Sequence, residues 1–356
     1  MRLLSRMLPI TLIALTLMAV PAHAWFRSPA TTFATLPPGA TPPEGLTVDA
    51  KGNVYVATFG FPASGASTTP GQLIEFDRHG HLVRQVPITN ASPHLLGLAF
   101  HPITGELLVL DFGAQKVLSV DPVSGNSSVF ATMPASAGIN ALTFDSAGNV
   151  YVSDSFLGAI WRTDMHGHGL TQWVTDPTLA TTGTPPFGAN GIAFNNEQTA
   201  LFVANTGNDT VVKIPVTTSQ GGLMPGAPEV FVNSINGADG LVIDDEDNIW
   251  VCANQSDEIV VIDKTGRVIA KLGDFGGIDH HGAAIGLLFP ASLAFSGEFL
   301  YVSNLALDIR LFGLPQAVDS QWAAQVTKYT VSRISAKIPP IFGLQGPSHC
   351  CERDDR

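Results

Sequence analysis

Four oxygen-bearing side chains stand at the same position of a repeated sequence pattern. They are Glu44, Asn140, Asn190 and Asp239, and a short apolar run follows each of them, as in "DGLVI" from Asp239. A lone carboxylate next to a buried strand is costly to desolvate, so this position calls for a chemical reason. Two carboxylates and two amides form an all-oxygen ligand set, which favours Ca²⁺, or else Mg²⁺, Mn²⁺ or another divalent cation, over Zn²⁺.

The elements that must position these residues form an internal repeat. Each copy contains a short apolar strand, a polar turn and a second apolar strand. The copies begin at Glu44, Leu96, Asn140, Asn190, Asp239 and Ala291, which gives steps of 52, 44, 50, 49 and 52 residues. A period of about 40–50 residues with several strands per copy is the signature of a β-propeller. The repeat therefore predicts an all-β fold, a six-bladed β-propeller.

The ends of the chain predict how the ring of blades closes. "TFATLPPG" at 32–39 resembles "VFATMPAS" at 129–136, which ends the second copy. We therefore expect residues 32–37 to form the outer strand of the last blade, beside a third strand near 326–334. An N-terminal strand that closes the last blade in this way removes exposed sheet edges.

In a propeller, the first strand of each blade lines the central channel, so the six starting residues should form a ring at one channel mouth. Two carboxylates at ~4 Å repel by about 4 kcal/mol at an effective dielectric of ~20, and a bound cation relieves that repulsion. Four protein ligands leave coordination positions open for water or substrate, as metal-assisted chemistry requires. The alternative is that these polar residues line a water-filled channel and bind nothing.

Loops on the same face supply candidates for proton transfer. His94 in "SPHLLG" and His280 and His281 in "GGIDHHGAAIG" are candidate general bases, because histidine titrates near neutral pH. Asp239 is a candidate as ligand and as base or nucleophile. The alternative for the three histidines is an exposed loop position without a chemical role.

At these residues the chain resembles a known family. The segments "PEGLTVDAKGNVYVA", "GANGIAF" and "GADGLVIDDEDNIWVCA" are similar to blade motifs of the gluconolactonase / senescence-marker-protein (regucalcin-like) family. That family belongs to the six-bladed calcium propellers, together with serum paraoxonases and squid-type diisopropyl-fluorophosphatases. The resemblance implies a Ca²⁺-dependent hydrolase of a small-molecule lactone or ester, with the metal held by Glu44, Asn140, Asn190 and Asp239.

Three departures from the family pattern bear on the substrate. Ala141 follows the blade-three asparagine where gluconolactonase-like members usually carry aspartate, and "ASAGINALTF" lacks the arginine that grips sugar acids. Leu96 stands where paraoxonase-like members use a histidine. The first two departures disfavour a sugar-acid lactone. Repeats such as "GNVYVSDSFLGAIWRTD" also resemble NHL repeats, so a non-catalytic ligand- or protein-binding propeller remains an alternative, and a lyase- or synthase-like propeller is a third.

Composition and the termini define the remaining expectations. Residues 1–24 have a positive start, an apolar core and an "AHA" site, which predicts a signal peptide and a periplasmic or secreted protein. We expect the propeller to span 25–345, with no transmembrane span, and a flexible tail to occupy 346–356. The net charge of −12 and the lack of a basic run argue against nucleic-acid binding. Three cysteines make no disulfide framework. There is no G-x-S-x-G motif, so we expect no serine-hydrolase chemistry. We also expect a monomer.

Overall fold

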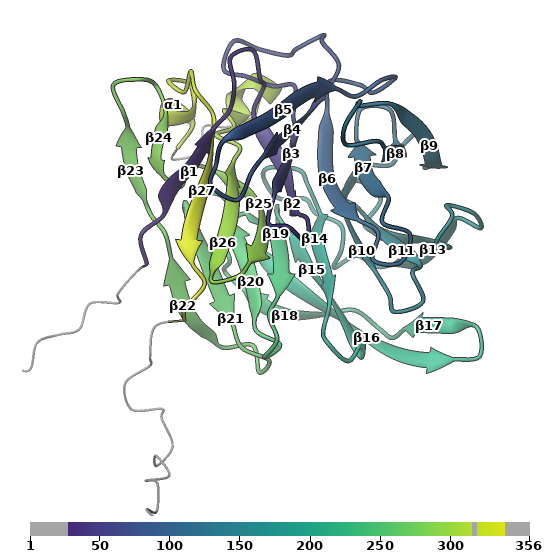
Figure 1. The fold of residues 1–356 in the computed structure, drawn as a ribbon. Helices are drawn as coiled ribbons and strands as arrows, with labels where there is room; N and C mark the ends of the chain where they lie inside the picture. Colours follow the sequence, from purple (N-terminus) through teal and green to yellow (C-terminus); the bar gives the residue numbers. More distant parts are fainter. Residues whose placement is uncertain (1–27, 315–318, 339–356) are drawn as a thin grey trace, which may run out of the picture.

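The structure is a computed structural model, and it describes residues 28–314 and 319–338. The expected signal peptide (1–24) and tail (346–356) lie outside the described residues. In the described ranges the chain forms a ring of six sheets (Figure 1), so the predicted six-bladed propeller is confirmed.

Each blade is an antiparallel sheet of at least four strands that follow one another outward from the channel. Blade one contains β2 (Pro43–Val48), β3 (Val54–Thr58), β4 (Gln72–Phe76) and β5 (Leu82–Pro87). Blade two contains β6 (Leu95–Phe100), β7 (Leu107–Asp111), β8 (Lys116–Val120) and β9 (Ser127–Thr132). Blade three contains β10 (Ile139–Phe144), β11 (Val150–Asp154), β12 (Ala159–Thr163) and β13 (Thr171–Thr175).

The second half of the ring repeats this plan with insertions. Blade four contains β14 (Ala189–Phe194), β15 (Ala200–Asn205), β16 (Thr210–Ser219), β17 (Gly222–Pro225) and β18 (Glu229–Asn233). Blade five contains β19 (Ala238–Ile243), β20 (Ile249–Ala253), β21 (Glu258–Ile262) and β22 (Val268–Leu272), and a hairpin of β23 (Phe275–Ile278) and β24 (Ala284–Gly286) follows it. Blade six contains β25 (Pro290–Ser296), β26 (Phe299–Asn304), β27 (Thr330–Ser335) and β1 (Thr31–Thr35).

The two ends of the described chain meet in blade six, as predicted. β1 pairs antiparallel with β27, with Thr31 opposite Arg333 and Thr35 opposite Thr330. Between β26 and β27 run two short helices, η1 (Ile309–Phe312) and α1 (Ser320–Ala323). No helix in the described ranges is both long and apolar enough to span a membrane.

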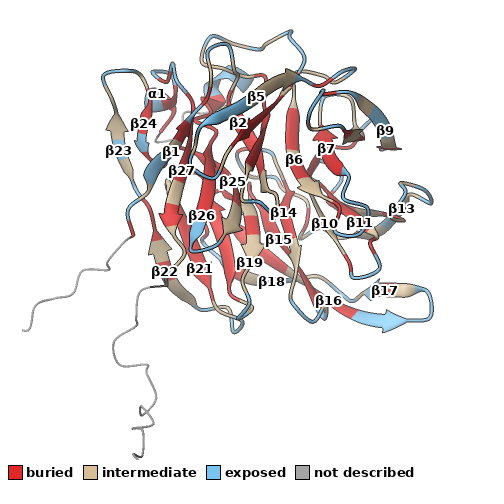
Figure 2. Cartoon of the chain, in the orientation of Figure 1, coloured by how far each residue is buried: buried red, intermediate tan, exposed pale blue. Residues whose placement is uncertain are grey.

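The second strand of each blade forms the buried core. Val54, Val109, Val152 and Val203 have no exposed surface, and they pack between neighbouring sheets rather than around one centre. β-Branched residues suit these flat, doubly covered strands. Figure 2 shows this gradient: β7 and β26 are buried, whereas the outer strands β5 and β9 are largely exposed. The inner strands therefore hold the channel wall on a rigid support.

Candidate metal centre at the end of the channel

The six repeat-starting residues lie together at one end of the channel. All of them are buried, with exposed fractions between 0% and 5%. Five of the six line a single cavity of about 40 Å³. The cavity wall consists of Glu44, Phe59, Leu96, Asn140, Pro185, Phe187, Asn190, Thr206, Asp239, Asn254, Phe289, Leu305, Leu307, Ile309, Phe312 and Leu314. Glu44, Asn140, Asn190 and Asp239 are therefore brought to one place, and we call these four residues the oxygen ring.

A β-bulge turns the ring residue in every blade. The register between first and second strands shifts from Pro43 to Leu46 in blade one and from Ala238 to Leu241 in blade five, and equivalent shifts occur in the other four blades. Each bulge leaves the ring residue and its successor out of the paired ladder. A bulge of this kind re-aims a side chain, which lets the ring residue face the channel while the rest of the strand stays paired.

Glycine after the ring residue brings neighbouring first strands into close contact. A Cβ atom added at Gly191 would lie 2.5 Å from Asp239 O, and one added at Gly240 would lie 2.4 Å from Ala291 O. Gly45 and Gly97 approach the following blade in the same manner. The missing side chains let the strands converge, so the ring stays narrow enough for its oxygens to share one small cavity.

A hydroxyl group fixes the orientation of the Asn190 amide. Asn190 Nδ2 donates to Thr206 Oγ1 at 2.9 Å, and Thr206 Oγ1 donates its own proton to Ala238 O at 2.8 Å. Because that proton is already committed to a carbonyl, Thr206 can only accept from the amide. The nitrogen of Asn190 must therefore face Thr206, which turns the side-chain oxygen away from it.

The same arrangement recurs in blade three. Asn140 Nδ2 donates to Ser155 Oγ at 3.4 Å, and Ser155 donates to Ala189 O at 2.7 Å. The oxygen of the Asn140 amide is buried and has no hydrogen-bond partner. A buried acceptor without a partner costs about 1–3 kcal/mol, so this oxygen is arranged for a ligand that supplies positive charge or a donor.

The two carboxylates of the ring show the same lack of partners. Asp239 Oδ2 accepts a hydrogen bond from Asn254 Nδ2 at 2.8 Å, whereas Asp239 Oδ1 and Glu44 Oε2 are buried without a partner. Burial raises the pKa of Asp239 to about 7, although the hydrogen bond from Asn254 acts in the opposite direction. Burial, and then the charge of Asp239, raise the pKa of Glu44 well above its usual range. Burial is the main cause of both shifts, and the charge of Asp239 adds to it only at Glu44.

The donor set fits a hard divalent cation. Three buried oxygens that lack partners, from Glu44, Asn140 and Asp239, come from three different blades and border one cavity. Carboxylate and amide oxygens are the ligands that Ca²⁺ prefers. Among the described residues there is no group of three or more His, Cys, Asp or Glu side chains that could hold a metal. The ring holds only two such side chains, and its other two donors are amides.

The rest of the cavity wall is apolar. Ten of its sixteen residues, such as Phe59, Phe187, Phe289 and Phe312, have no hydrogen-bonding side chain. Five of the ten come from the segment 305–314, which crosses above the ring between β26 and α1. We call these ten residues the apolar wall: Phe59, Leu96, Pro185, Phe187, Phe289, Leu305, Leu307, Ile309, Phe312 and Leu314.

His94 lies behind this wall rather than in it. Its ring stacks on Phe61 at 4.5 Å and lies 5.4 Å from the ring of Phe59, which does line the cavity. Its Nδ1 atom is buried without a partner, and burial lowers the pKa of the imidazole. His94 is therefore neutral at neutral pH but separated from the oxygen ring by an aromatic side chain.

His280 and His281 lie farther from the oxygen ring in the fold. They form the exposed tip of the hairpin between β23 and β24, where Asp279 accepts the backbone N–H of His281 at 2.8 Å. Neither residue lines the cavity. The structure thus brings the four predicted metal ligands together and does not bring the three histidines to them, so the catalytic roles of His94, His280, His281 and Asp239 stay predictions.

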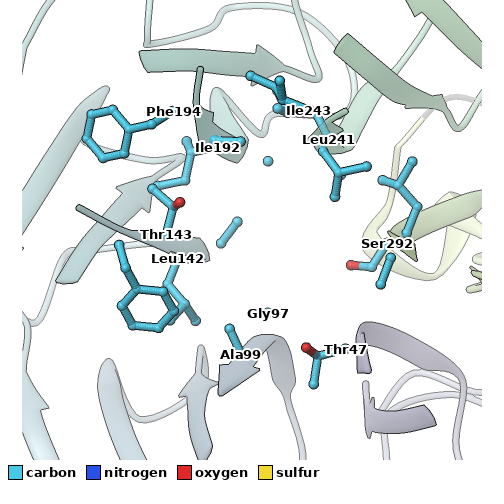
Figure 3. A pocket seen from close by; sticks show the side chains of 18 of the residues that line it. Thr47, Gly97, Ala99, Leu142, Thr143, Ile192, Phe194, Leu241, Ile243 and Ser292 are labelled. Carbon is cyan, nitrogen blue, oxygen red and sulfur yellow. The ribbon is translucent and has the colours of Figure 1, made fainter. Parts of the chain in front are cut away.

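The opposite end of the channel has a different character. There the later residues of the first strands surround an open cavity of about 560 Å³ (Figure 3). Thr47, Thr143 and Ser292 face it among apolar side chains such as Leu142 and Leu241. No ionisable residue lines this cavity. The candidate chemistry therefore lies at the oxygen-ring end alone.

Three supporting residues escaped the analysis of the sequence. Ser155, Thr206 and Asn254 each stand just after a second strand and contact the ring residue that lies 15 or 16 positions earlier. The repeat contained this signal, because the offset is nearly constant. The residues directly before them include Asp154 and Asn205, whose side chains bond loop backbone such as Gly138 N and Ala180 O.

A comparison with known families matches part of the chain. Residues 114–273 match the family model described as the SMP-30/Gluconolactonase/LRE-like region. The matched segment contains Asn140, Asn190 and Asp239, while Glu44 lies before it. The predicted family resemblance is therefore confirmed. No curated protein matches the chain in sequence.

Solved structures share the fold of this chain. A luciferin-regenerating enzyme is 16% identical with a TM-score of 0.59, over 83% of this chain and 92% of that one. The calcium-binding protein regucalcin from Agrobacterium tumefaciens is 19% identical with a TM-score of 0.55, over 88% and 100%. A gluconolactonase from Xanthomonas campestris is 14% identical with a TM-score of 0.56, over 80% and 96%. At these identities the likeness shows the fold.

Proposed function

We propose that the protein is an exported, divalent-metal-dependent hydrolase of a lactone or ester, with Ca²⁺ as the preferred ion. One observation carries the proposal: three buried oxygens without partners converge in one cavity at the end of the propeller channel. The family model, whose description includes gluconolactonase, and a structural neighbour described as a calcium-binding regucalcin support it.

The oxygen ring would hold the cation, with Glu44 and Asp239 balancing its charge. A bound cation of this kind polarises a carbonyl oxygen and stabilises negative charge that develops on it. Thr206, Ser155 and Asn254 keep the ring donors in place. The apolar wall would leave a bound acyl group few polar neighbours other than the oxygen ring, which strengthens the electrostatic interactions there.

The reaction itself is a hydrolysis. The oxygen of water bonds to the acyl carbon, the acyl C–O bond breaks, and the leaving alkoxide takes one proton of that water. The carboxylic acid that forms loses its proton at neutral pH. Asp239 Oδ1 is the candidate acceptor of the proton that water loses. This oxygen is buried in the cavity and has no hydrogen-bond partner.

Metal analysis and an activity panel test the proposal together. Purified protein should contain a stoichiometric divalent cation and hydrolyse at least one lactone or aryl ester, and a chelator should abolish that activity. The double variant Glu44→Gln/Asp239→Asn should lose both properties. The matched control Asp245→Asn/Glu246→Gln makes the same chemical change at two exposed residues and should retain them.

Two outcomes would overturn parts of the proposal. Activity that survives chelation would exclude the metal-dependent mechanism. A metal-loaded protein without activity on any lactone or ester would exclude the hydrolase and favour a non-catalytic binding propeller.

A further inference from the structure

The polar and apolar side chains of the cavity at the oxygen ring lie in separate parts of its wall. All of its hydrogen-bonding side chains, the four ring residues with Thr206 and Asn254, belong to the floor at the channel end. Everything above that floor is the apolar wall. A ligand that fills the cavity therefore meets polar groups at one end only.

An apolar surface continues outward from the wall. The ring of Phe312 lies 4.4 Å from that of Phe61, and the ring of Phe187 lies 5.7 Å from that of Phe156. Phe156 is 50% exposed and Leu311 is 38% exposed. Scattered exposed apolar residues need no explanation, but these continue a buried apolar wall to the surface.

The present volume restricts how a substrate enters. About 40 Å³ accommodates an ion with one or two waters, not the ring of a lactone with its substituent. Part of the wall must therefore move. Phe59 and Phe289 are 4% and 2% exposed and held by the core, whereas Phe312 is 37% exposed at the end of η1. The end of η1 is the part of the wall with least packing to lose.

We infer that the substrate is a lactone or ester with an apolar alkyl or aryl substituent, whose carbonyl faces the oxygen ring and whose substituent contacts Phe312 and Phe187. This inference rests on the proposed function. A polyhydroxylated lactone would bring hydroxyl groups against side chains that cannot accept or donate, and each would lose its hydrogen bonds to water. An alkyl substituent instead gains from every methylene that leaves water.

A homologous series of γ-lactones tests the inference. γ-Butyrolactone, γ-hexalactone, γ-octalactone and γ-decalactone add two methylenes at each step. Burial of each methylene predicts a rise in kcat/KM of about fourfold, hence about an order of magnitude per step until the wall is filled. D-Glucono-1,5-lactone should be hydrolysed more slowly than γ-decalactone.

Variants of the wall supply the control. Phe312→Ser should lower the ratio of the γ-decalactone rate to the γ-butyrolactone rate several-fold. Val123→Ser should leave the ratio unchanged, since Val123 is 64% exposed between β8 and β9 and does not line the cavity. A ratio that both variants alter equally, or that neither alters, would overturn the role of the wall.

A binding measurement separates this inference from the proposed function. The γ-lactams with the same alkyl chains resist hydrolysis, and calorimetry gives their affinities directly. Affinity that rises with chain length and falls in Phe312→Ser supports the apolar subsite even if no lactone is hydrolysed, in which case only the hydrolase proposal fails. Hydrolysis with a flat chain-length profile, or with a preference for D-glucono-1,5-lactone, overturns the inference and leaves the hydrolase. If neither the affinity for the lactams nor the rate of hydrolysis depends on chain length, the inference is overturned outright.

Discussion

At the scale of single residues, the amides of the oxygen ring depend on hydroxyl groups outside the ring. Thr206 accepts from Asn190 and donates to Ala238 O, so its two hydrogen bonds leave the amide one favourable orientation. Residues that orient metal ligands in this way typically contribute about 10–100-fold to metal affinity. The candidate site thus includes residues outside the oxygen ring.

Replacement of Thr206 by valine tests this orienting role. Thr206→Val keeps the shape of the side chain but removes the acceptor, which frees Asn190 to rotate. We expect about 10–100-fold weaker binding of Ca²⁺, measured by calorimetry. Thr58→Val is the control, because Thr58 is equally buried and accepts Gln72 N at 2.9 Å but does not contact the ring. Equal losses of affinity in both variants would refute the orienting role.

A buried carboxylate outside the oxygen ring predicts a dependence of stability on pH. Asp319 is 3% exposed, neither of its side-chain oxygens has a hydrogen-bond partner, and burial raises its pKa to about 6. A raised pKa means that the folded state binds the proton more tightly than the unfolded state does. The stability that Asp319 contributes is therefore present below its unfolded pKa of about 4 and is lost as the pH rises through about 6.

The variant Asp319→Asn should remove this pH dependence. At pH 8 its free energy of unfolding should exceed that of the wild type by about 1–3 kcal/mol, because the buried charge is gone. At pH 4 the two proteins should differ little. Urea denaturation at the two pH values measures the difference. A variant that is less stable than the wild type at pH 8 would contradict the prediction and indicate that the charge has a partner in solution.

At the scale of elements, the first strands position the ring through bulges and glycines. The bulge turns the ring residue, and the glycine after it lets the next blade approach. Gly191→Ala would place a methyl group 2.5 Å from Asp239 O and from Leu241 N, both backbone atoms that cannot swing aside. We expect a loss of about 1–3 kcal/mol in the free energy of unfolding, together with weaker binding of Ca²⁺ as β14 and β19 separate.

The control for that substitution is Gly221→Ala. Gly221 does not have the positive φ that disfavours alanine, and the atom nearest to an added Cβ would be Ser219 Oγ at 3.8 Å. We expect a change within about 0.5 kcal/mol there. If Gly191→Ala has the free energy of unfolding and the Ca²⁺ affinity of the wild type, close approach of the first strands does not determine the geometry of the oxygen ring.

The elements also show why the sequence predicted the ring but not the individual side chains that surround it. Glu44, Asn140, Asn190 and Asp239 were found because the repeat aligns them and because carboxylates are rare before apolar strands. The bulges leave no mark in the residue types, since they are a property of hydrogen-bond register. The position of Phe312 could not be predicted either, because the segment 305–314 lies in an insertion that no other blade shares.

At the scale of the whole molecule, β1 forms the contact between blade six and blade one, which we call the seam. In every other blade, the outer strand that contacts the next blade is continuous in sequence with its own blade. A Cβ atom at Gly80 of blade one would lie 2.3 Å from Phe33 O, just as one at Gly167 of blade three would lie 2.1 Å from Phe130 O. β1 therefore contacts blade one as β9 of blade two contacts blade three. The difference is that β1 is joined to its own blade by hydrogen bonds and side chains alone.

Phe33 links the two blades at this seam. Its ring lies 4.5 Å from Tyr301 in blade six and 6.5 Å from Phe76 in blade one. Phe33→Ala should lower the free energy of unfolding by about 2 kcal/mol, less than for a fully buried phenylalanine because Phe33 is half-buried. It should also speed amide hydrogen exchange in β1 and β27, because the terminal strand can open without the rest of the ring.

The equivalent variant Phe130→Ala separates closure of the ring from simple loss of packing. Phe130 occupies the same place in β9, whose strand is continuous with the chain on both sides. It should lose comparable stability but leave exchange in β1 and β27 as slow as in the wild type. Because the oxygen ring draws Glu44 from blade one and Asp239 from blade five, with blade six between them, an open seam should also weaken binding of Ca²⁺ in Phe33→Ala. Unchanged Ca²⁺ affinity with fast exchange in β1 would show instead that the ring is held by the first strands independently of closure.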